Sequence, residues 1–165
     1  MTTEASLNKR EQPPIRVLLV DDHEHVLWGL SKLIEGETPR MTVTGTARTM
    51  AQALAAVGEK RPDVVVLDLF LGRENSLDRL PALGASGAAL VVLTGARDAE
   101  IHRRAMQRGA RTVVLKEEPA EVLLHEIERA AEWRNAPPDN AAGQQDCQSA
   151  VQARIAGFIS STTRR

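Results

Sequence analysis

The chain has 165 residues, of which 42% are hydrophobic and 26% charged, a composition ordinary for a globular domain with an appended segment. Its formal net charge of −1 gives no overall electrostatic case for binding nucleic acid or a membrane surface. The single cysteine, Cys147, excludes an internal disulfide framework, and neither a signal peptide nor an apolar run long enough to span a bilayer is visible. We therefore expect a cytoplasmic protein with no membrane partner.

A polar tail precedes the first predicted strand. Residues 1–12 are mostly polar or charged and are predicted to be disordered, and two prolines separate them from an unbroken apolar run at 15–20. This run ends in a pair of acids, Asp21 and Asp22. A folded domain is therefore expected to begin near residue 13, with a strand that leads directly into two carboxylates.

The segment after the acidic pair is predicted to be a helix that stops before Pro39. Four apolar residues recur on one face of this helix: Val26, Leu30, Leu33 and Ile34. Leu27 and Trp28 fall off that face, so we expect both to be partly exposed and to dock a partner protein. The alternative is that Trp28 packs on the last helix near Trp133.

A second strand and helix follow in the same way. Residues 41–46 alternate apolar or small residues with threonine, which is typical of a half-covered strand. Thr49 can cap the helix after it, and that helix is expected to end at Gly58. The repeat of strand and helix favours an α/β fold.

The third strand carries the acid around which the sequence is organised. Residues 64–67 are all branched and apolar, as in a central parallel strand that is covered on both faces. Ligands bind beyond the carboxyl ends of such strands, and Asp68 stands at that position. The helix after it, at 75–83, is expected to be short because Pro81 removes a backbone donor from its interior.

Two further units complete the predicted sheet. Strands are expected at 88–93 and 112–115, and they lead into Thr94 and Lys116. A helix at 98–107 follows the first of them, and a helix opened by a proline follows the second. Five such units predict a doubly wound α/β fold, with a flavodoxin-like five-stranded parallel sheet of order 2-1-3-4-5 and five surrounding helices.

The residues at the predicted strand ends have complementary chemistry. They are Asp21, Asp22, Asp68, Thr94 and Lys116. Three carboxylates repel one another unless a cation lies among them, and a hard site built of oxygen ligands suits Mg²⁺. A lysine nearby supplies a positive charge for phosphate. This set predicts an aspartyl-phosphate nucleophile, because the metal and the lysine neutralise charge on the transferring phosphoryl group.

With these residues in place, positions 15–134 resemble the receiver domain of bacterial two-component response regulators. The Val-Asp-Asp-His sequence that ends at His23, with Gly29 and Leu30 after it, is most similar to the subfamily with a LuxR-type helix-turn-helix output domain. The resemblance implies a receiver domain at 13–134 that is phosphorylated by a histidine kinase or a phosphotransfer protein. Such a domain catalyses its own phosphorylation and dephosphorylation but turns over no external substrate.

The resemblance also implies a role for each site residue. Asp68 is the phosphoacceptor, and Lys116 pairs with the phosphoryl group. Asp21, Asp22 and Asp68 hold Mg²⁺ together with the backbone carbonyl of Phe70. A single Asp before a helix is more often a helix cap. The residues at all the strand ends fit the family pattern together, and this favours a metal and phosphorylation site. The family's Lys-x-x-Pro pattern also fits after Lys116, and its proline is commonly cis.

The expected switch differs from the family pattern. The resemblance implies that Thr94 binds a phosphoryl oxygen after activation. The family usually carries Tyr or Phe three residues before the lysine, and that aromatic ring rotates inward as the threonine moves. Here the second switch position is Val113, so the usual aromatic switch is absent. How activation propagates is left open.

The remaining candidate residues are discounted as ligands. His23 is interpreted as a packing or capping residue, and His25, His102 and His125 lie on predicted helices without a matching cluster. Two other classes are disfavoured. A haloacid-dehalogenase-like phosphatase needs a second Asp where Phe70 stands, and a flavodoxin-like cofactor binder needs a Ser/Thr/Gly-rich phosphate loop after the first strand.

The composition changes near the end of the chain. Residues 135–145 are rich in Pro, Asn, Gln and Gly and are predicted to be a linker. Residues 146–165 have apolar residues at helical spacing, which predicts either a loosely docked helix or the lead into a DNA-binding domain absent from this chain. The first expectation for output is transcription regulation, with DNA contacted only through such a domain. The alternatives are a standalone receiver or phosphate relay, and dimerisation on phosphorylation is left open.

Overall fold

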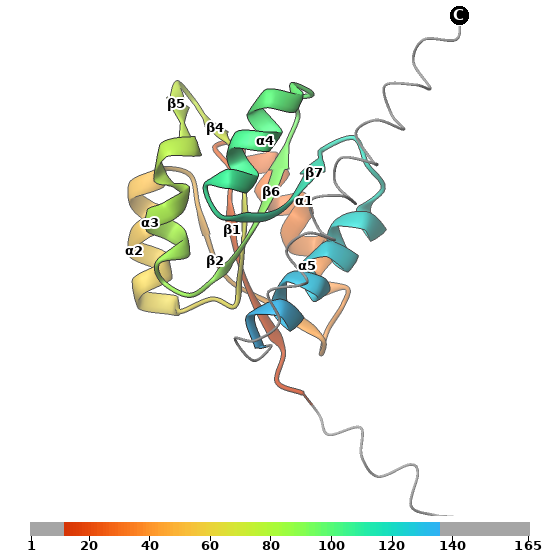
Figure 1. Cartoon of the computed structure of the whole chain (residues 1–165). Helices are drawn as coiled ribbons and strands as arrows, with labels where there is room; N and C mark the ends of the chain where they lie inside the picture. Colours follow the sequence, from red (N-terminus) through yellow and green to blue (C-terminus); the bar gives the residue numbers. More distant parts are fainter. Residues whose placement is uncertain (1–11, 136–165) are drawn as a thin grey trace, which may run out of the picture.

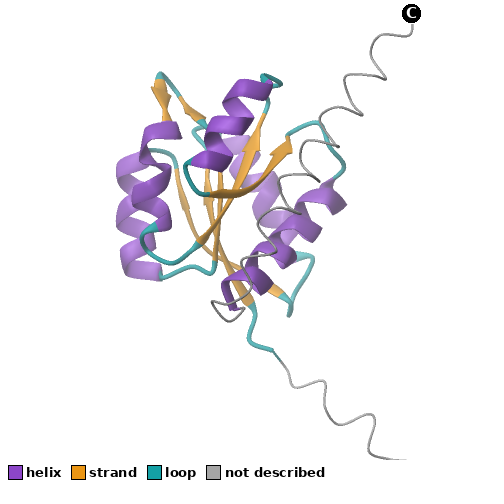
Figure 2. Cartoon of the chain, viewed as in Figure 1, coloured by secondary structure: helices purple, strands orange, loops and turns teal. Residues whose placement is uncertain are grey.

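The computed structural model describes residues 12–135, which form a parallel sheet between two layers of helices (Figure 1, Figure 2). The sheet has five strands: β1 (Ile15–Val20), β2 (Met41–Ala47), β3 (Val64–Leu67), β6 (Ala89–Thr94) and β7 (Ala110–Leu115). Their order is β2-β1-β3-β6-β7, and every neighbouring pair is parallel. Counted among themselves, the strands have the order 2-1-3-4-5, so the predicted doubly wound fold is confirmed. The predicted tail, linker and C-terminal helix fall on residues 1–11 and 136–165, outside the described part.

Helices cover both faces of the sheet within residues 12–135: α1 (Glu24–Glu35), α2 (Met50–Lys60), α3 (Leu80–Gly84), α4 (Ala99–Gln107) and α5 (Ala120–Asn135). Helices α2, α3 and α4 bury their apolar residues in one core cluster, and α1 and α5 bury theirs in the other. In β3, Val65 and Leu67 belong to the first cluster, whereas Val64 and Val66 belong to the second. A strand covered on both faces needs an apolar side chain at every position, which explains the unbroken run. None of the described helices is long and apolar enough to cross a membrane.

Helix α1 buries most of the predicted face and, in addition, Leu27: Ile34 is fully buried, and Leu30 and Leu33 pack partly buried against the same core cluster. Its fully buried residues are Leu27 and Ile34, and Leu27 is only 6% exposed, so the prediction that Leu27 is partly exposed is wrong. These residues are seven positions apart, close to two helical turns, and therefore point to the same side. Trp28 is 68% exposed, as predicted, and this exposure disfavours the alternative that it packs near Trp133.

Helix α2 begins at the predicted cap, Thr49, but continues through Gly58 to Lys60, so the predicted end is wrong. Arg61 reverses the chain with φ of 47°, and the guanidinium of Arg16 on β1 donates to the carbonyls of Lys60 at 2.5 Å and Arg61 at 3.1 Å. A side chain from another element thus satisfies carbonyls at the helix end, and a glycine cap is not needed.

The segment after Asp68 contains an element that the sequence did not predict. Strands β4 (Phe70–Leu71) and β5 (Glu74–Asn75) form a small antiparallel hairpin, with Gly72 at φ of 62° in its turn. The hairpin projects from the edge of the sheet at which β6 and β7 end (Figure 2). Strands of two residues are too short to show a periodic pattern, which explains why it was missed.

Prolines shape two other connections. The 3₁₀ turn η1 (Ser76–Arg79) precedes α3, and Pro81 lies in the first turn of α3, so the predicted shortening of this helix is confirmed. Pro119 directly precedes α5. The expectation of a cis bond at Pro119 is wrong, because Thr38–Pro39 is the cis peptide bond found in the described chain.

Candidate functional site

The predicted site residues lie at the carboxyl edge of the sheet. Asp21 and Asp68 directly follow β1 and β3, Thr94 ends β6, and Lys116 directly follows β7. Backbone pairing continues into these positions: the amide of Asp68 donates to the carbonyl of Val20 at 2.9 Å, and the amide of Lys116 donates to that of Thr94 at 3.0 Å. Because the backbone is hydrogen-bonded up to these positions, the residues that carry these side chains are held next to one another at one edge of the sheet.

Lys116 links two of the carboxylates. Its Nζ lies 2.6 Å from Oδ2 of Asp21 and 2.7 Å from Oδ2 of Asp68. Both carboxylates are buried, and the lysine side chain is mostly buried. Buried charges are tolerated only when they are paired and hydrogen-bonded, so the ammonium group stabilises both acids at once.

This pairing shifts the pKa of two of the groups. Burial acts to raise the pKa of Asp21, but hydrogen bonds from Lys116 and His23 outweigh it, and the pKa lies below its ordinary value. Burial acts to lower the pKa of Lys116, but hydrogen bonds to Asp21 and Asp68 outweigh it, and that pKa lies above its ordinary value. Asp21 and Lys116 are therefore both charged at neutral pH.

Asp22 completes the acidic cluster and tests whether the site fits a metal ion. Its Oδ2 accepts a hydrogen bond from the amide of Gly72 at 2.8 Å, which ties the hairpin turn to the site. Its Oδ1 is buried and lies 3.0 Å from Nδ1 of His23. One ligand atom each from Asp21, Asp22, Asp68 and His23 lie within 4.8 Å of one another. Three carboxylates whose oxygens lie this close together fit a hard cation such as Mg²⁺.

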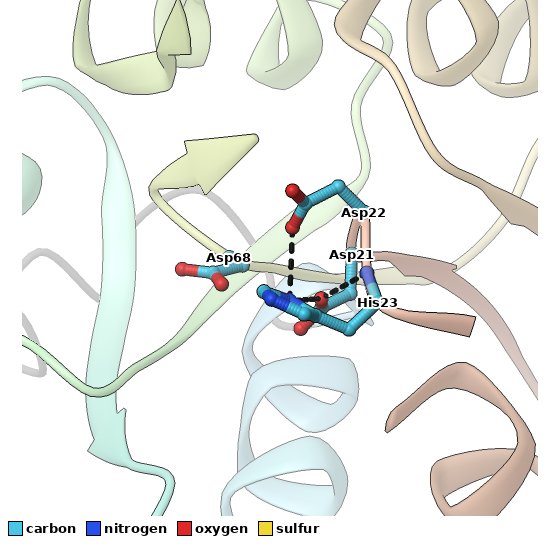
Figure 3. Close-up of side chains that lie close together, drawn as sticks. All are labelled: Asp21, Asp22, His23 and Asp68. Atoms are coloured by element: carbon cyan, nitrogen blue, oxygen red, sulfur yellow. Dashed lines mark hydrogen bonds and ion pairs between the residues drawn. The ribbon is translucent and has the colours of Figure 1, made fainter. Parts of the chain in front are cut away.

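The imidazole ring of His23 lies among these carboxylates (Figure 3). Its Nδ1 is 2.9 Å from Oδ1 of Asp21 and 3.0 Å from Oδ1 of Asp22. His23 is the N-cap residue of α1, but its side chain makes no capping hydrogen bond, so the capping interpretation holds only for its backbone. Its position directly after two clustered acids was the signal that could have placed its ring at the site.

The two switch residues have mainly apolar surroundings. Thr94 is fully buried, and its Oγ1 accepts a hydrogen bond from the amide of Ala96 at 3.2 Å. Val113 is 5% exposed and belongs to the core cluster beneath α4. An aliphatic side chain has no polar atom that could bond to the threonine or to the loop after it.

Two large apolar side chains stay exposed near the acidic cluster. The amide of Phe70 donates to Oδ1 of Asp68 at 3.1 Å, while its ring is 38% exposed. Trp28 lies in the second turn of α1, the helix that follows the acidic pair. Leu27 was predicted to share this docking surface, but it lies in the core, and only Trp28 of the two is accessible.

The sequence analysis missed one buried polar residue close to the switch. His102 lies on α4, and its Nε2 is 2.5 Å from the carbonyl oxygen of Ala96. It stands three residues before the buried Ala105, so helical spacing was the signal for its inward position. It is outside the acidic cluster found among the described residues.

Comparisons with known proteins give a consistent result. The sequence profile described as "Response regulator receiver domain" matches residues 17–128. A protein-glutamate methylesterase/protein-glutamine glutaminase of Nitrobacter hamburgensis is 33% identical over 133 residues, which are 74% of this chain and 35% of the relative. The DNA-binding transcriptional activator DevR/DosR of Mycobacterium tuberculosis is 31% identical over 150 residues, which are 87% of this chain and 64% of the relative. The chain thus spans about a third of the first relative.

A solved structure has the same fold. The crystal structure of a LuxR-family two-component response regulator from Aurantimonas sp. SI85-9A1 superposes with a TM-score of 0.68 at 27% sequence identity. The match covers 79% of this chain and 94% of that chain. The arrangement of strands and helices described above is therefore shared with a protein of known structure.

Proposed function

Because the chain belongs to the family of response regulator receiver domains, we propose that Asp68 accepts a phosphoryl group from a histidine kinase or a phosphotransfer protein. One observation carries the proposal: Asp68 is buried at the end of the central strand, with Nζ of Lys116 2.7 Å from its Oδ2. The ammonium group beside this carboxylate supplies positive charge where negative charge develops on a transferring phosphoryl group.

In the proposed reaction, an oxygen of Asp68 attacks the phosphorus of a phosphohistidine. The new O–P bond forms as the P–N bond breaks, and the leaving imidazole takes a proton from water. Lys116 is bonded to Asp68 before the reaction and passes to a phosphoryl oxygen, since its ammonium group sits on a flexible chain. The hydroxyl of Thr94 binds another phosphoryl oxygen in the product.

The residues at the edge also fit Mg²⁺ as the cofactor. Asp21, Asp22 and Asp68 supply carboxylate oxygens, and we assign the backbone carbonyl of Phe70 as a further ligand. The clustering of one oxygen from each of these carboxylates within 4.8 Å supports this assignment. When bound, the ion supplies positive charge against the transferring phosphoryl group.

Trp28 is the proposed docking residue for the protein that donates the phosphoryl group. It is a large exposed aromatic side chain on the helix that starts beside the acidic cluster. Exposed aromatic residues are frequent anchors of protein interfaces. The core position of Leu27 excludes it from this role.

For the output, we propose transcription regulation in the cytoplasm. The similarity to DevR/DosR, a DNA-binding activator, covers 87% of this chain and supports this reading. In this scheme residues 13–134 are the receiver, 135–145 a linker and 146–165 the lead into an output domain through which alone DNA is bound, with dimerisation on phosphorylation. A receiver that works through protein contacts or as a phosphate relay is the second candidate, since the methylesterase relative joins a similar region to a different activity.

Intact-mass spectrometry tests the phosphoacceptor. The protein incubated with acetyl phosphate and Mg²⁺ is expected to gain the mass of one phosphoryl group, and Asp68→Asn or EDTA should prevent the gain. Asp78→Asn, a change at an exposed carboxylate on the 3₁₀ turn, is the matched control and should leave the gain intact. A phosphoryl adduct on Asp68→Asn, or equal labelling with EDTA present, contradicts the proposal.

A further inference from the structure

His102 is a buried polar residue that the proposed chemistry does not use. Its side chain is 2% exposed on the inward face of α4. Its Nε2 lies 2.5 Å from the carbonyl oxygen of Ala96, and because a carbonyl only accepts, Nε2 carries the proton and donates. Its Nδ1 is buried and makes no hydrogen bond within the described residues. Buried polar atoms are nearly always paired, so an exception calls for an explanation such as a role in a second conformation.

The residue that accepts this bond is itself tied to the phosphorylation switch. The amide of Ala96 donates to Oγ1 of Thr94 at 3.2 Å, and the carbonyl of the same residue accepts from His102. A short hydrogen-bonded chain thus runs from the hydroxyl of Thr94 through Ala96 to α4. Gly95 lies between Thr94 and Ala96 and has open space where a Cβ would lie. Neighbouring atoms therefore leave room for this part of the loop to move.

The residue expected to couple the threonine to its surroundings offers no comparable contact. Val113 is buried in the core cluster beneath α4 and carries no polar atom. Ala105, on the same helix as His102, is packed in that cluster. Apolar packing therefore holds α4 against the sheet, while the hydrogen bond of His102 connects α4 to the loop that follows Thr94.

We propose that His102 is the positioning residue that transmits the phosphorylation of Asp68, through Thr94 and Ala96, to α4. The inference rests on the proposed function, in which the Thr94 hydroxyl turns to a phosphoryl oxygen. That turn removes the acceptor of the Ala96 amide, and the loop moves with the threonine. The carbonyl of Ala96 then moves relative to His102, and the hydrogen bond either carries α4 along or breaks and frees the helix. His102 touches no reacting atom and acts only through Ala96.

The test measures chemistry and helix response on the same samples. Phosphorylation by acetyl phosphate and Mg²⁺ is followed by intact mass, and amide hydrogen exchange is followed over residues 95–107. The wild type is expected to change its exchange in this segment on phosphorylation. In His102→Leu, labelling of Asp68 should stay within about twofold of the wild type, while the exchange response falls by about threefold or more, in the range that single residues contribute to coupling.

A conservative variant separates transmission from simple packing. In His102→Gln the amide nitrogen can reach the place of Nε2 and donate to Ala96, so the exchange response should return, whereas a role in packing alone predicts no such rescue. His125→Gln, on the exposed side of α5, is the matched control and should respond like the wild type. In the wild-type protein, the ¹⁵N resonance of His102 Nε2 should shift on phosphorylation, a measurement that needs no variant to fold.

The outcomes distinguish the two proposals. A wild type that takes no phosphoryl group overturns the proposed function and this inference with it. Normal labelling with a full exchange response in His102→Leu overturns the inference alone, as does an Nε2 resonance that does not move on phosphorylation. Normal labelling with a lost response in His102→Leu and a restored response in His102→Gln supports it.

Discussion

The two halves of the carboxyl edge are built in different ways. At the ends of β1 and β3 the contacts are ionic and short, with Lys116 at 2.6 and 2.7 Å from two buried carboxylates. At the end of β6 the hydroxyl of the fully buried Thr94 accepts a hydrogen bond of 3.2 Å from the amide of Ala96, and Val113, two residues before the register partner of Thr94 on β7, is aliphatic. We call these the acidic half and the switch half. Strong, redundant contacts suit a site that must keep one geometry, and weak ones suit a part that has to move.

The largest expected effect comes from the centre of the acidic half. Lys116→Met removes the cation between two buried carboxylates, so phosphorylation by acetyl phosphate should slow by about 100-fold or more. The free energy of unfolding should fall by about 1–3 kcal/mol, because the two charges lose their shared donor. Intact mass and urea unfolding measure these effects. Lys60→Met, at an exposed lysine on α2, should change neither the phosphorylation rate nor the free energy of unfolding. If Lys116→Met behaved like Lys60→Met, the prediction would be contradicted.

Phe70, also in the acidic half, is expected to control how long the phosphoryl group survives. Its ring can neither donate nor accept a hydrogen bond, so it cannot orient an attacking water, although the small Gly95 and Ala96 leave the opposite side open. Phe70→Asn should hasten loss of the phosphoryl group by up to about 100-fold, the scale of assistance to an attacking water. The decay is followed by intact mass with Mg²⁺ present. Phe70→Leu should keep the slow decay, and an unchanged or slower rate in Phe70→Asn contradicts the prediction.

Trp28 should matter for the donor protein and not for the chemistry. Trp28→Ala is expected to slow transfer from the cognate kinase by about tenfold, as for an aromatic anchor worth about 1–2 kcal/mol in an interface. Phosphorylation by acetyl phosphate should be unchanged, since the side chain lies outside the acidic half. Trp133→Ala is the control, because Trp133 is exposed on α5 and stacks on Arg111. Equal slowing with both donors would show that Trp28 supports the fold and is not a docking residue.

A substitution in the switch half should affect stability and leave the chemistry alone. Val113→Ala leaves a void in the core cluster and should lower the free energy of unfolding by about 1–3 kcal/mol. Labelling by acetyl phosphate should remain within about twofold of the wild type, since Val113 belongs to the hydrophobic core cluster and carries no polar or charged group. A large loss of labelling in a folded Val113→Ala protein would mean that the two halves are not separable.

The smallest expected effect is the pH dependence of stability. The pKa of Asp21 is lower in the folded state than its ordinary value of 3.8, so its contribution is present above that value and is lost as pH falls through the folded pKa. The pKa of Lys116 is raised above 10.5, so its contribution is present below that value and is lost as pH rises through the folded pKa. Urea midpoints between about pH 5 and pH 2 should fall less steeply for Asp21→Asn than for the wild type. If the urea midpoints of the two proteins fall equally steeply with pH, the prediction that Asp21 contributes to this pH dependence is contradicted.

Much of the fold could be predicted because its signals are local. The apolar run of β3 has no polar position, which indicates a strand covered on both faces, and a strand covered on both faces ends at a ligand-binding edge. Apolar runs of the same kind predict Asp68, Thr94 and Lys116 at strand ends, where the structure places them. Two of the predictions that proved wrong concern the burial of one helix residue and the end of another helix. The burial of Leu27 and the continuation of α2 past Gly58 depend on how a neighbouring element packs against the helix, as the contact of Arg16 with the end of α2 illustrates.

What the sequence alone determined is the order of elements and the chemistry carried at the end of each strand, because both follow from patterns within one segment. Only the tertiary structure decided which of these groups touch. Lys116 bonds to Asp21 across 95 positions and to Asp68 across 48, and no local pattern specifies such a pairing. The hydrogen bond from His102 to Ala96 spans only six residues, yet it too exists because α4 turns that side chain against the sheet. A side chain's partners depend on the packing of whole elements, and that packing is the sum of contacts made by the entire chain.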